Sequence, residues 1–488
     1  MSSDQDWPYR LDPDDVATCI RVLGESEKLD PNHPDAAAIR RATGAIFKTL
    51  KKRRREERRN AVADADRAVV HATATGSPNR IDDETAGIAL ASNVAGASAG
   101  RFIKPRPCYI CKTDYVDVDA FYHQLCPSCA AMSHTKRDAR TDLSGRRALL
   151  TGGRAKIGMY IALRLLRDGA HTTITTRFPN DAARRFAALE DSSDWLHRLR
   201  IIGIDLRDPA QVVALADTVA AAGPLDILIN NAAQTVRRSP DAYAPLVAAE
   251  SEPLPAGPLP DMLTFDHISD AHPLALAGSL SDHPVPHMPE AMTGSELSRL
   301  ALLAGSASAD RIATLNAIDA GGLVPDLHHV NSWTQTVEHV DPMELLEVQL
   351  CNTTAPFLLI SRLRAAMAAS TARRKYIVNV SAMEGVFGRG YKGPGHPHTN
   401  MAKAALNMLT RTSAGEMLTD GILMTAVDTG WITDERPHYT KMRLAEEGFH
   451  APLDLVDGAA RVYDPIVQGE AGVDLYGCFL KDYQKAQW

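Results

Sequence analysis

The sequence predicts an α/β fold in which residues 141–488 form a doubly wound parallel sheet, preceded by a helical segment and a small cysteine-bearing module. Two observations support this prediction. An apolar run at 148–150 ends at a glycine-rich turn, 151–158, that leads into a helical pattern. Further apolar and β-branched runs then alternate with helical patterns, at 172–176, 201–206 and 225–233. Strands that alternate with helices are typical of a parallel sheet covered on both faces.

The glycine-rich turn has the composition of a phosphate-binding turn, because it reads TGGRAKIG from Thr151 to Gly158. A turn between a strand and a helix directs backbone N–H groups and the positive end of the helix dipole at one point. That point attracts the pyrophosphate of a dinucleotide, although an ordinary connection between a strand and a helix can share the composition. The candidates for binding a dinucleotide are Thr151, Gly152, Lys156, Ile157 and Gly158.

Motifs further along the chain make this pattern more specific. They are Asp205-Leu206 after the third run, Asn231 and Ala232 in NNAA, Asn352 in CNTTAPF, the strand 376–381, and Lys403 in MAKAAL. Together with the turn, they resemble the short-chain dehydrogenase/reductase (SDR) superfamily over about residues 142 to 488, apart from one insertion. The resemblance implies a Rossmann-type sheet, a homo-oligomer, and a bound nicotinamide dinucleotide whose adenine lies beside Asp205 and Leu206. It adds three candidates for binding the cofactor, namely Asn231, Ala232 and Lys403.

The resemblance also implies a catalytic site, of which this chain keeps only a part. In the family a Tyr four residues before the Lys protonates a carbonyl while NAD(P)H gives hydride, and here Thr399 stands four residues before Lys403. A Tyr has a pKa of about 10 that a neighbouring ammonium lowers, whereas a threonine hydroxyl is far too weak an acid. The family also has a Ser that binds the substrate carbonyl, and this chain has Ala382 at that position. The adjacent Ser381 is expected to face the other side of its strand. Asn352 and Lys403 remain.

A glycine-rich segment before Thr399 could supply another acid, since it carries Tyr391, His396 and His398. Histidine is the side chain most readily tuned to act as an acid near neutral pH. His398 is adjacent to Thr399 and is therefore the candidate proton donor. For each of these three residues, an ordinary place in the loop is the favoured alternative.

Two departures from the family pattern concern the choice of cofactor. Lys156 replaces the second glycine of the turn, where its side chain either crowds the pyrophosphate or adds a positive charge beside it. Arg177 follows the second strand, where the family uses an acidic residue to hold the ribose of NAD. A guanidinium suits the additional phosphate of NADP, so the sequence favours NADP over NAD. The alternative for both residues is a solvated surface charge.

The second strong signal is a pair of Cys-x-x-Cys motifs within residues 101–140, formed by Cys108 with Cys111 and by Cys126 with Cys129. This spacing is typical of a knuckle in which four thiolates hold one zinc ion tetrahedrally. Four protein ligands leave no open position, so the zinc is expected to be structural and not catalytic. Redox-active cysteine pairs or a disulfide are the alternatives.

The regions around these two modules carry weaker signals. Residues 1–70 are expected to be helical, and the basic run 51–59 indicates either a nucleic-acid contact or a solvated helix face, with interleaved acids favouring the latter. Residues 71–100 are rich in small residues, as in a flexible or loosely packed linker. The insertion at about 235–340 is expected to be mostly extended loop, with a short helix at 296–303. It can serve as a lid, a docking surface or a surface excursion.

Composition sets the outer limits. The 488 residues are 45% hydrophobic, which is enough apolar material for one large core with smaller modules. The net charge of the chain is -7. No apolar run reaches the ~20 residues that span a bilayer, so a cytoplasmic protein is expected. Three functions remain open. They are an NADP-dependent oxidoreductase with an unusual proton donor, an inactive nucleotide-binding scaffold or sensor that engages a protein partner, and a nucleic-acid-associated zinc protein.

Overall fold

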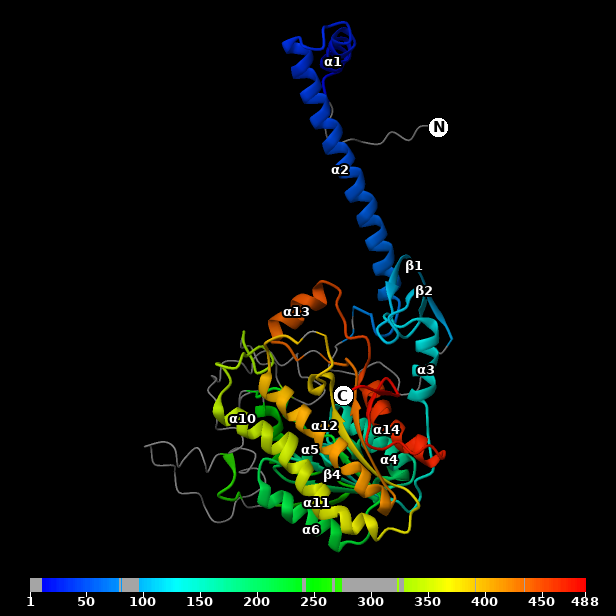
Figure 1. The fold of residues 1–488 in the computed structure, drawn as a ribbon, viewed down its shortest axis with the longest axis vertical. Coiled ribbons are helices and arrows are strands. Elements are labelled where there is room, and N and C mark those ends of the chain that lie inside the picture. Colours follow the sequence, from blue (N-terminus) through cyan, green and yellow to red (C-terminus); the bar gives the residue numbers. More distant parts are fainter. Residues whose placement is uncertain are drawn as a thin grey trace, which may run out of the picture. The chain divides into compact units, whose positions relative to one another are not determined.

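The computed structural model describes residues 11–78, 80, 96–238, 243–265, 268–273, 323, 329–390, 392–433 and 435–488 (Figure 1). The helix expected at 296–303 and the candidate Tyr391 lie outside these residues. The chain divides into two compact units, Met1–Ala68 and Val69–Trp488.

The first unit is helical. It contains α1 (Pro13–Ser26) and most of α2 (Pro34–His71). Asp12 caps α1 by accepting the N–H of Asp14 at 2.8 Å. The basic run lies on α2, where exposed Lys52 and Arg53 approach glutamates four residues later, at 3.9 and 3.5 Å. This spacing is the one at which opposite charges on a solvated helix pair.

The second unit is built on a nine-stranded sheet in the order β11-β10-β9-β8-β6-β3-β4-β5-β7. Neighbouring strands are parallel except for the terminal hairpin of β10 and β11. The strand order reverses at β3, which confirms the predicted doubly wound α/β fold and places the switch point between β3 and β6. The strands are β3 (Arg147–Leu150), β4 (His171–Thr176), β5 (Leu199–Gly203), β6 (Ile227–Asn230), β7 (Asp261–Thr264), β8 (Lys375–Ser381), β9 (Ile422–Asp428), β10 (Phe479–Lys481) and β11 (Gln484–Ala486).

Helices cover both faces of the sheet, and each face has its own apolar core. Side chains alternate along the strands, so that Ile227 and Ile229 join one core while Leu228 joins the other. The first core packs against α4 (Lys156–Arg167), α5 (Pro179–Ala187) and α14 (Leu455–Glu470). The second packs against α6 (Pro209–Ala221), α11 (Ala355–Ala368) and α12 (Pro397–Met417). Shorter elements are α7 (Ala244–Glu250), α10 (Pro342–Gln349), α13 (His438–Glu446), the 3-10 turns η1 (Ser192–Asp194), η2 (Leu196–Arg198), η6 (Met383–Gly385) and η7 (Leu418–Asp420), and the π-helical turn η5 (Leu350–Thr354).

The described part of the insertion adds regular structure to one edge of the sheet. Strand β7 pairs with β5, and α7 lies against α5. The carboxylate of Glu250 accepts the backbone N–H groups of Asn180 and Asp181, at 3.0 and 2.7 Å, in the first turn of α5. The expectation that the insertion is mostly extended loop is therefore incomplete, because β7 pairs with the edge strand β5 and forms regular structure there.

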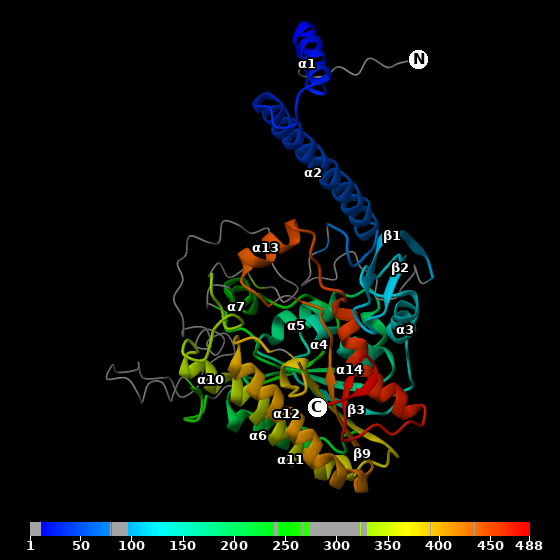
Figure 2. The same cartoon turned by 45° about the horizontal axis from the view of Figure 1, so that its top comes forward.

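The cysteine-bearing module consists of β1 (Ser98–Pro107), β2 (Asp114–Asp119) and α3 (Pro127–Arg137) and packs beside α14 and α4 (Figure 2). Arg137 is fully buried and forms two hydrogen bonds with Asp454 at the start of α14, at 2.7 and 2.8 Å. The Tyr122 hydroxyl donates to Asp457 at 2.6 Å. The preceding segment is also packed, since Thr75 is buried and donates to the Phe121 carbonyl at 2.8 Å. This part of the expected linker is thus fixed to the module.

Candidate active site and metal centre

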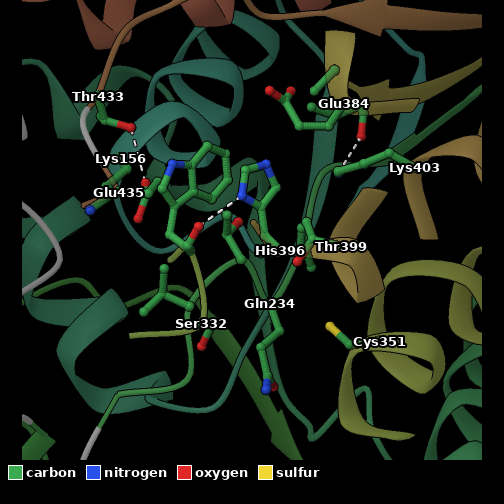
Figure 3. A pocket seen from close by; sticks show the side chains of 18 of the residues that line it. Lys156, Gln234, Ser332, Cys351, Glu384, His396, Thr399, Lys403, Thr433 and Glu435 are labelled. Atoms are coloured by element: carbon green, nitrogen blue, oxygen red, sulfur yellow. Dashed lines mark hydrogen bonds between the residues drawn. The ribbon is translucent and has the colours of Figure 1, made fainter. Parts of the chain in front are cut away.

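A large cavity of about 1380 Å³ opens at the carboxyl ends of the sheet strands. Its walls come from the segments that follow β3, β4, β5, β6, β8 and β9, and from the first turns of α12. Figure 3 shows residues from several of these elements around the space, among them Gln234, Glu384, His396, Thr399 and Lys403. This is the place where doubly wound sheets bind their ligands.

The glycine-rich turn forms one wall, and its geometry requires glycine at two positions. Gly152 has a φ of +70°, and a Cβ there would lie 2.9 Å from Cα of Ala232. A Cβ on Gly158 would lie 1.9 Å from the Gly152 carbonyl oxygen, so helix α4 could not approach the strand ends. The Thr151 hydroxyl accepts the N–H groups of Asn231 and Ala232, both at 3.0 Å, and joins the turn to the segment after β6.

Lys156 is the first residue of α4 and has a φ of +53°. This is the left-handed region that favours glycine, in agreement with the glycine that the family pattern predicts at this position. The side chain lines the cavity, as does that of Ile157. The lysine thus keeps the backbone shape of the turn and places a positive charge at the cavity wall.

Arg177, directly after β4, lies on the same wall. Its guanidinium donates to the Tyr243 hydroxyl at 3.3 Å and lies 5.1 Å from the centre of that ring. Burial disfavours the Tyr243 phenolate, but Arg177 outweighs this effect, so the pKa of Tyr243 lies below its ordinary value. Both side chains line the cavity. A positive charge therefore lies at the carboxyl end of β4, where the sequence predicts it.

Asp205 and Leu206 also line the cavity, shortly after the end of β5. The Asp205 carboxylate is buried and accepts hydrogen bonds from Arg207 at 2.6 Å, with His272 at 3.2 Å. Burial alone would raise the pKa of Asp205, but Arg207 and His272 hold it well below its ordinary range. The carboxylate is therefore committed to protein partners, and Leu206 offers an apolar surface beside it.

Lys403 and Thr399 both line the cavity from the same face of α12 (Figure 3). Lys403 donates from Nζ to the Val380 carbonyl at 2.9 Å, and burial lowers the pKa of this amine to about 8. The Thr399 hydroxyl and the Asn400 side-chain oxygen are buried without a partner among the described residues. Buried polar atoms nearly always have a protein or water partner, so these two atoms are exceptional within the described residues.

Ala382 and Ser381 face different surroundings, as predicted for neighbouring residues at the end of a strand. Ala382 lines the cavity with a methyl group. Ser381 is buried and donates its hydroxyl to Oδ1 of Asn407 at 2.6 Å. Its proton is therefore engaged by Asn407.

Asn352 lies in the π-helical turn η5 and does not appear among the described residues that line the cavity. Its side chain accepts the N–H of Gln234 at 2.7 Å and donates to the Gln234 carbonyl at 2.9 Å. Asn352 therefore positions the segment after β6. Its neighbour Cys351 reaches the cavity, and burial raises the pKa of this thiol to about 11.

Of the two histidines before Thr399, only His396 is among the described residues that line the cavity. His398 is buried with Nε2 at 3.5 Å from a Glu344 oxygen, and it is absent from the described lining of the cavity. One residue along a helix corresponds to about 100° of rotation, so His398 cannot share the face of Thr399 and Lys403. His396 does line the cavity, where its ring stacks on Trp333 at 3.8 Å and its Nδ1 donates to the Trp333 carbonyl at 2.9 Å (Figure 3). The reason for choosing His398 as the proton donor is therefore removed.

Asp428, at the end of β9, is a cavity residue that the sequence did not single out. It lies opposite Ser381 in the sheet register, and burial raises the pKa of its carboxyl to about 6. Tyr109, between the first two cysteines, also reaches the cavity. A single acid after an apolar strand gives a weak sequence signal for Asp428, whereas nothing in the sequence connects Tyr109 with the sheet.

The four cysteines converge as predicted. The sulfur atoms of Cys108, Cys111, Cys126 and Cys129 all lie within 4.8 Å of one another. The sulfurs of Cys111 and Cys126 are 3.7 Å apart, close to the ~3.8 Å edge of a tetrahedron with Zn–S bonds of about 2.3 Å. The Cys126 N–H also points to the sulfur of Cys108 at 3.3 Å. The donor set and its spacing therefore fit one tetrahedral metal ion.

Within the described part of the chain, no helix combines the length and hydropathy needed to cross a membrane.

Comparison with known proteins gives a partial match at the nucleotide end of the sheet. Residues 146–245 match the short chain dehydrogenase family. A probable oxidoreductase of Streptomyces antibioticus is 40% identical over 91 residues, which cover 19% of this chain and 30% of the relative. A peroxisomal 2,4-dienoyl-CoA reductase of Danio rerio is 39% identical over 92 residues, again 19% and 30%. The matches therefore span less than a third of these two relatives.

Two longer similarities extend beyond that segment. An uncharacterized protein of Acanthamoeba polyphaga mimivirus is 29% identical over 374 residues, which cover 74% of this chain and 71% of the viral protein. A crystal structure of a short chain dehydrogenase from Burkholderia cenocepacia J2315 in complex with NADP covers 70% of this chain and 97% of its own, with 20% identity and a TM-score of 0.42.

Proposed function

We propose that this chain, a member of the short-chain dehydrogenase/reductase superfamily, is an NADP(H)-dependent oxidoreductase in which Asp428 replaces the usual tyrosine as proton donor. The observation that carries this proposal is the cavity at the strand ends, where the glycine turn, Arg177, Lys403 and unpartnered polar atoms meet.

The cofactor end of the cavity fits a phosphorylated dinucleotide. Gly152 and Gly158 leave the space that a backbone needs to approach a pyrophosphate. Lys and Arg outnumber Asp and Glu along the lining, although the whole chain carries a net charge of -7. Arg177 is placed to favour the additional phosphate of NADP over a bare ribose. NADPH, when bound, supplies the hydride.

The chain's own residues account for the remaining requirements. With a pKa of about 8, Lys403 is mostly protonated at pH 7 and offers a positive charge beside the reacting group. The Thr399 hydroxyl has a proton to donate in a hydrogen bond but does not ionise. Asp428 has a pKa of about 6, so its carboxyl can hold and release a proton near neutral pH. The proton that the substrate oxygen receives comes from this carboxyl.

A second function is suggested by two departures in the sequence. Thr399 and Ala382 have replaced the family's acid and its serine, so the cavity can bind a dinucleotide without using it for hydride transfer. The protein would then be a nucleotide-dependent scaffold or sensor that engages a partner through the cysteine module or the insertion.

The two functions are separated by binding and turnover measured together. Calorimetric titration of the zinc-loaded protein with NADPH and NADH tests the cofactor, and we expect tighter binding of NADPH. NADPH oxidation is then followed at 340 nm with a panel of carbonyl compounds. Lys403→Met should abolish any turnover found. NADPH binding without turnover on any carbonyl class supports the scaffold, and no binding of either nucleotide contradicts both functions.

We propose further that the four cysteines hold one structural zinc ion. Four thiolates satisfy its tetrahedral preference and leave no position for water or substrate. Metal analysis of the purified protein is expected to give one zinc per chain, and a protein without metal but with two disulfides would contradict this.

A further inference from the structure

We propose that the zinc knuckle, which is the segment 108–129 with the four cysteines, forms one wall of the cofactor cavity. We propose also that the Tyr109 hydroxyl donates a hydrogen bond to an oxygen of the bound dinucleotide. This inference rests on the proposed function, since it assigns a further contact to the same ligand. It gives the zinc a second role, because the metal then positions a residue that touches the cofactor.

The first step of the argument is the position of Tyr109. It lies between Cys108 and Cys111, yet it lines the cavity together with Lys112. Its hydroxyl accepts the backbone N–H of Trp431 at 2.9 Å. Trp431 and the adjacent Gly430 line the same cavity. The knuckle loop therefore reaches the segment after β9 from outside the sheet.

The second step concerns the proton of that hydroxyl. A phenol has one O–H donor in addition to its acceptor lone pairs. Tyr109 uses the acceptor side for Trp431, and within the described ranges no residue accepts its proton. A half-buried hydroxyl at a cavity wall therefore offers an unused donor to whatever occupies the cavity.

The third step identifies the ligand atom by its neighbours. Ile157, in the first turn of α4, belongs to the apolar cluster of the knuckle, together with Cys108, Tyr109 and Ile432. The knuckle therefore packs directly on the start of α4, to which the proposed function assigns the phosphates. The adjacent Lys156 and the knuckle's Lys112 also line this cavity, so the region suits an anionic oxygen. The dinucleotide supplies such oxygens in its pyrophosphate.

The fourth step explains why the metal matters. The body of the module is fixed to α14 by the buried Arg137 and Tyr122. The knuckle loop is different, because Cys111 is exposed and Lys112 has a φ of +64°. A metal ion bound to all four thiolates would hold this loop, and with it Tyr109, in place. Binding of the dinucleotide and retention of zinc should therefore favour each other.

The test compares two tyrosines of the same module. Tyr109→Phe removes the hydroxyl at the cavity, while the control Tyr115→Phe removes one that donates to the His123 carbonyl at 2.7 Å, and Tyr115 is not among the described lining residues. We expect Tyr109→Phe to weaken NADPH binding about tenfold. Tyr115→Phe should leave it unchanged, with zinc content confirming that both variants are folded.

Fragments of the cofactor locate the contact. Adenosine 2′,5′-bisphosphate lacks both the pyrophosphate and the nicotinamide, so its affinity should be equal in wild type and Tyr109→Phe. 2′-Phospho-ADP-ribose contains the pyrophosphate and should lose the same factor as NADPH. An equal loss for all three ligands would overturn the inference, because it would indicate a general disturbance of the cavity.

Zinc release provides a readout that does not depend on turnover. Transfer of zinc to a chromophoric chelator should be slower in wild type saturated with NADPH, and this protection should be reduced in Tyr109→Phe. If wild type binds NADPH but Tyr109→Phe binds it equally well, the inference is wrong and the proposed function stands. If wild type binds no NADPH, both are wrong.

Discussion

The two ends of the cavity differ in how much of their family pattern they retain. At the nucleotide end, the turn keeps Gly152 and Gly158 where no other residue fits, and Lys156 adopts the glycine-like backbone conformation. At the catalytic end, Lys403 remains but Thr399 leaves a buried hydroxyl without a partner in the described structure. The backbone shape of the turn is therefore retained, whereas individual side chains at the other end of the cavity are replaced.

The largest effect is expected from Asp428→Asn, which removes the proposed acid and keeps an oxygen for the Gly430 N–H. Loss of a general acid lowers turnover by roughly 10²- to 10⁴-fold, while NADPH binding should stay within about twofold. Wild-type turnover should fall as pH rises through about 6, because the carboxyl loses its proton. The exposed control Asp114→Asn should keep this profile. A variant that retains turnover would identify another donor.

Asp428→Asn also has a predicted effect on stability. The folded-state pKa of about 6 lies above the ordinary value of 3.8, so the folded protein binds a proton that the unfolded chain does not between these values. Wild type should therefore gain stability from this group as pH falls from about 6 to 4. At pH 8 the variant should be more stable by up to about 3 kcal/mol, and the difference should vanish near pH 4. Thermal unfolding across this range measures both values.

The next effect concerns the nucleotide end. Gly158→Ala places a methyl group at 1.9 Å from the Gly152 carbonyl oxygen, so the turn or the helix must move. We expect NADPH affinity to fall by about 100-fold or more, since misplacement of the turn is worth roughly 3 kcal/mol. Gly415→Ala, at an exposed position of α12 with open space around its Cβ, is the control and should raise stability by about 1 kcal/mol. Unchanged affinity in Gly158→Ala would place the nucleotide elsewhere.

A smaller effect tests cofactor choice. Arg177→Ala should weaken NADPH binding by about 10- to 100-fold, the range for a lost charge-assisted hydrogen bond, and leave NADH binding nearly unchanged. Arg185→Ala, whose guanidinium bonds to Asp181 and is absent from the described cavity lining, should change neither. Calorimetry with both nucleotides measures the ratio. Equal losses for NADPH and NADH would show that Arg177 does not read the additional phosphate.

The smallest effect tests the catalytic end alone. Thr399→Val replaces an unpartnered buried hydroxyl with a methyl group of similar size, so stability should rise by about 1 kcal/mol. Thr410→Val, on the same helix, should instead lose stability, because that hydroxyl donates to the Leu406 carbonyl and accepts from Asn379. Denaturant unfolding compares them. A fall in turnover with Thr399→Val would show that its hydroxyl touches the substrate, and unchanged turnover would restrict it to packing.

Much of the fold could be predicted from the sequence because its signals are local. A strand, a glycine turn and a helix lie within about twenty residues, and further strand-helix units follow along the chain. The two cysteine pairs are local in the same sense, since Cys108 and Cys111 share one tight loop. The predicted sheet and the convergence of the four sulfurs are both confirmed. The role of Lys403 and the cofactor preference of Arg177 stay predictions.

Other features depend on which way a side chain faces or on contacts between distant segments. The sequence placed His398 next to Thr399, but a helix turns by about 100° per residue, and only the folded helix showed that His398 points to Glu344. The pKa of Asp428 is raised only because the folded sheet buries its carboxyl at the end of β9. Strand β7 likewise forms because an open sheet edge was available.

The sequence by itself therefore determined the strand-turn-helix units, the glycine-rich turn and the two cysteine pairs, because each depends on residues close together in the chain. Only the tertiary structure decided which side chains share the cavity. Tyr109 and Trp431 are separated by more than three hundred residues, yet they lie 2.9 Å apart. That contact arises from the packing of the knuckle on α4 and α14, which is a property of the whole folded unit and not of any segment within it.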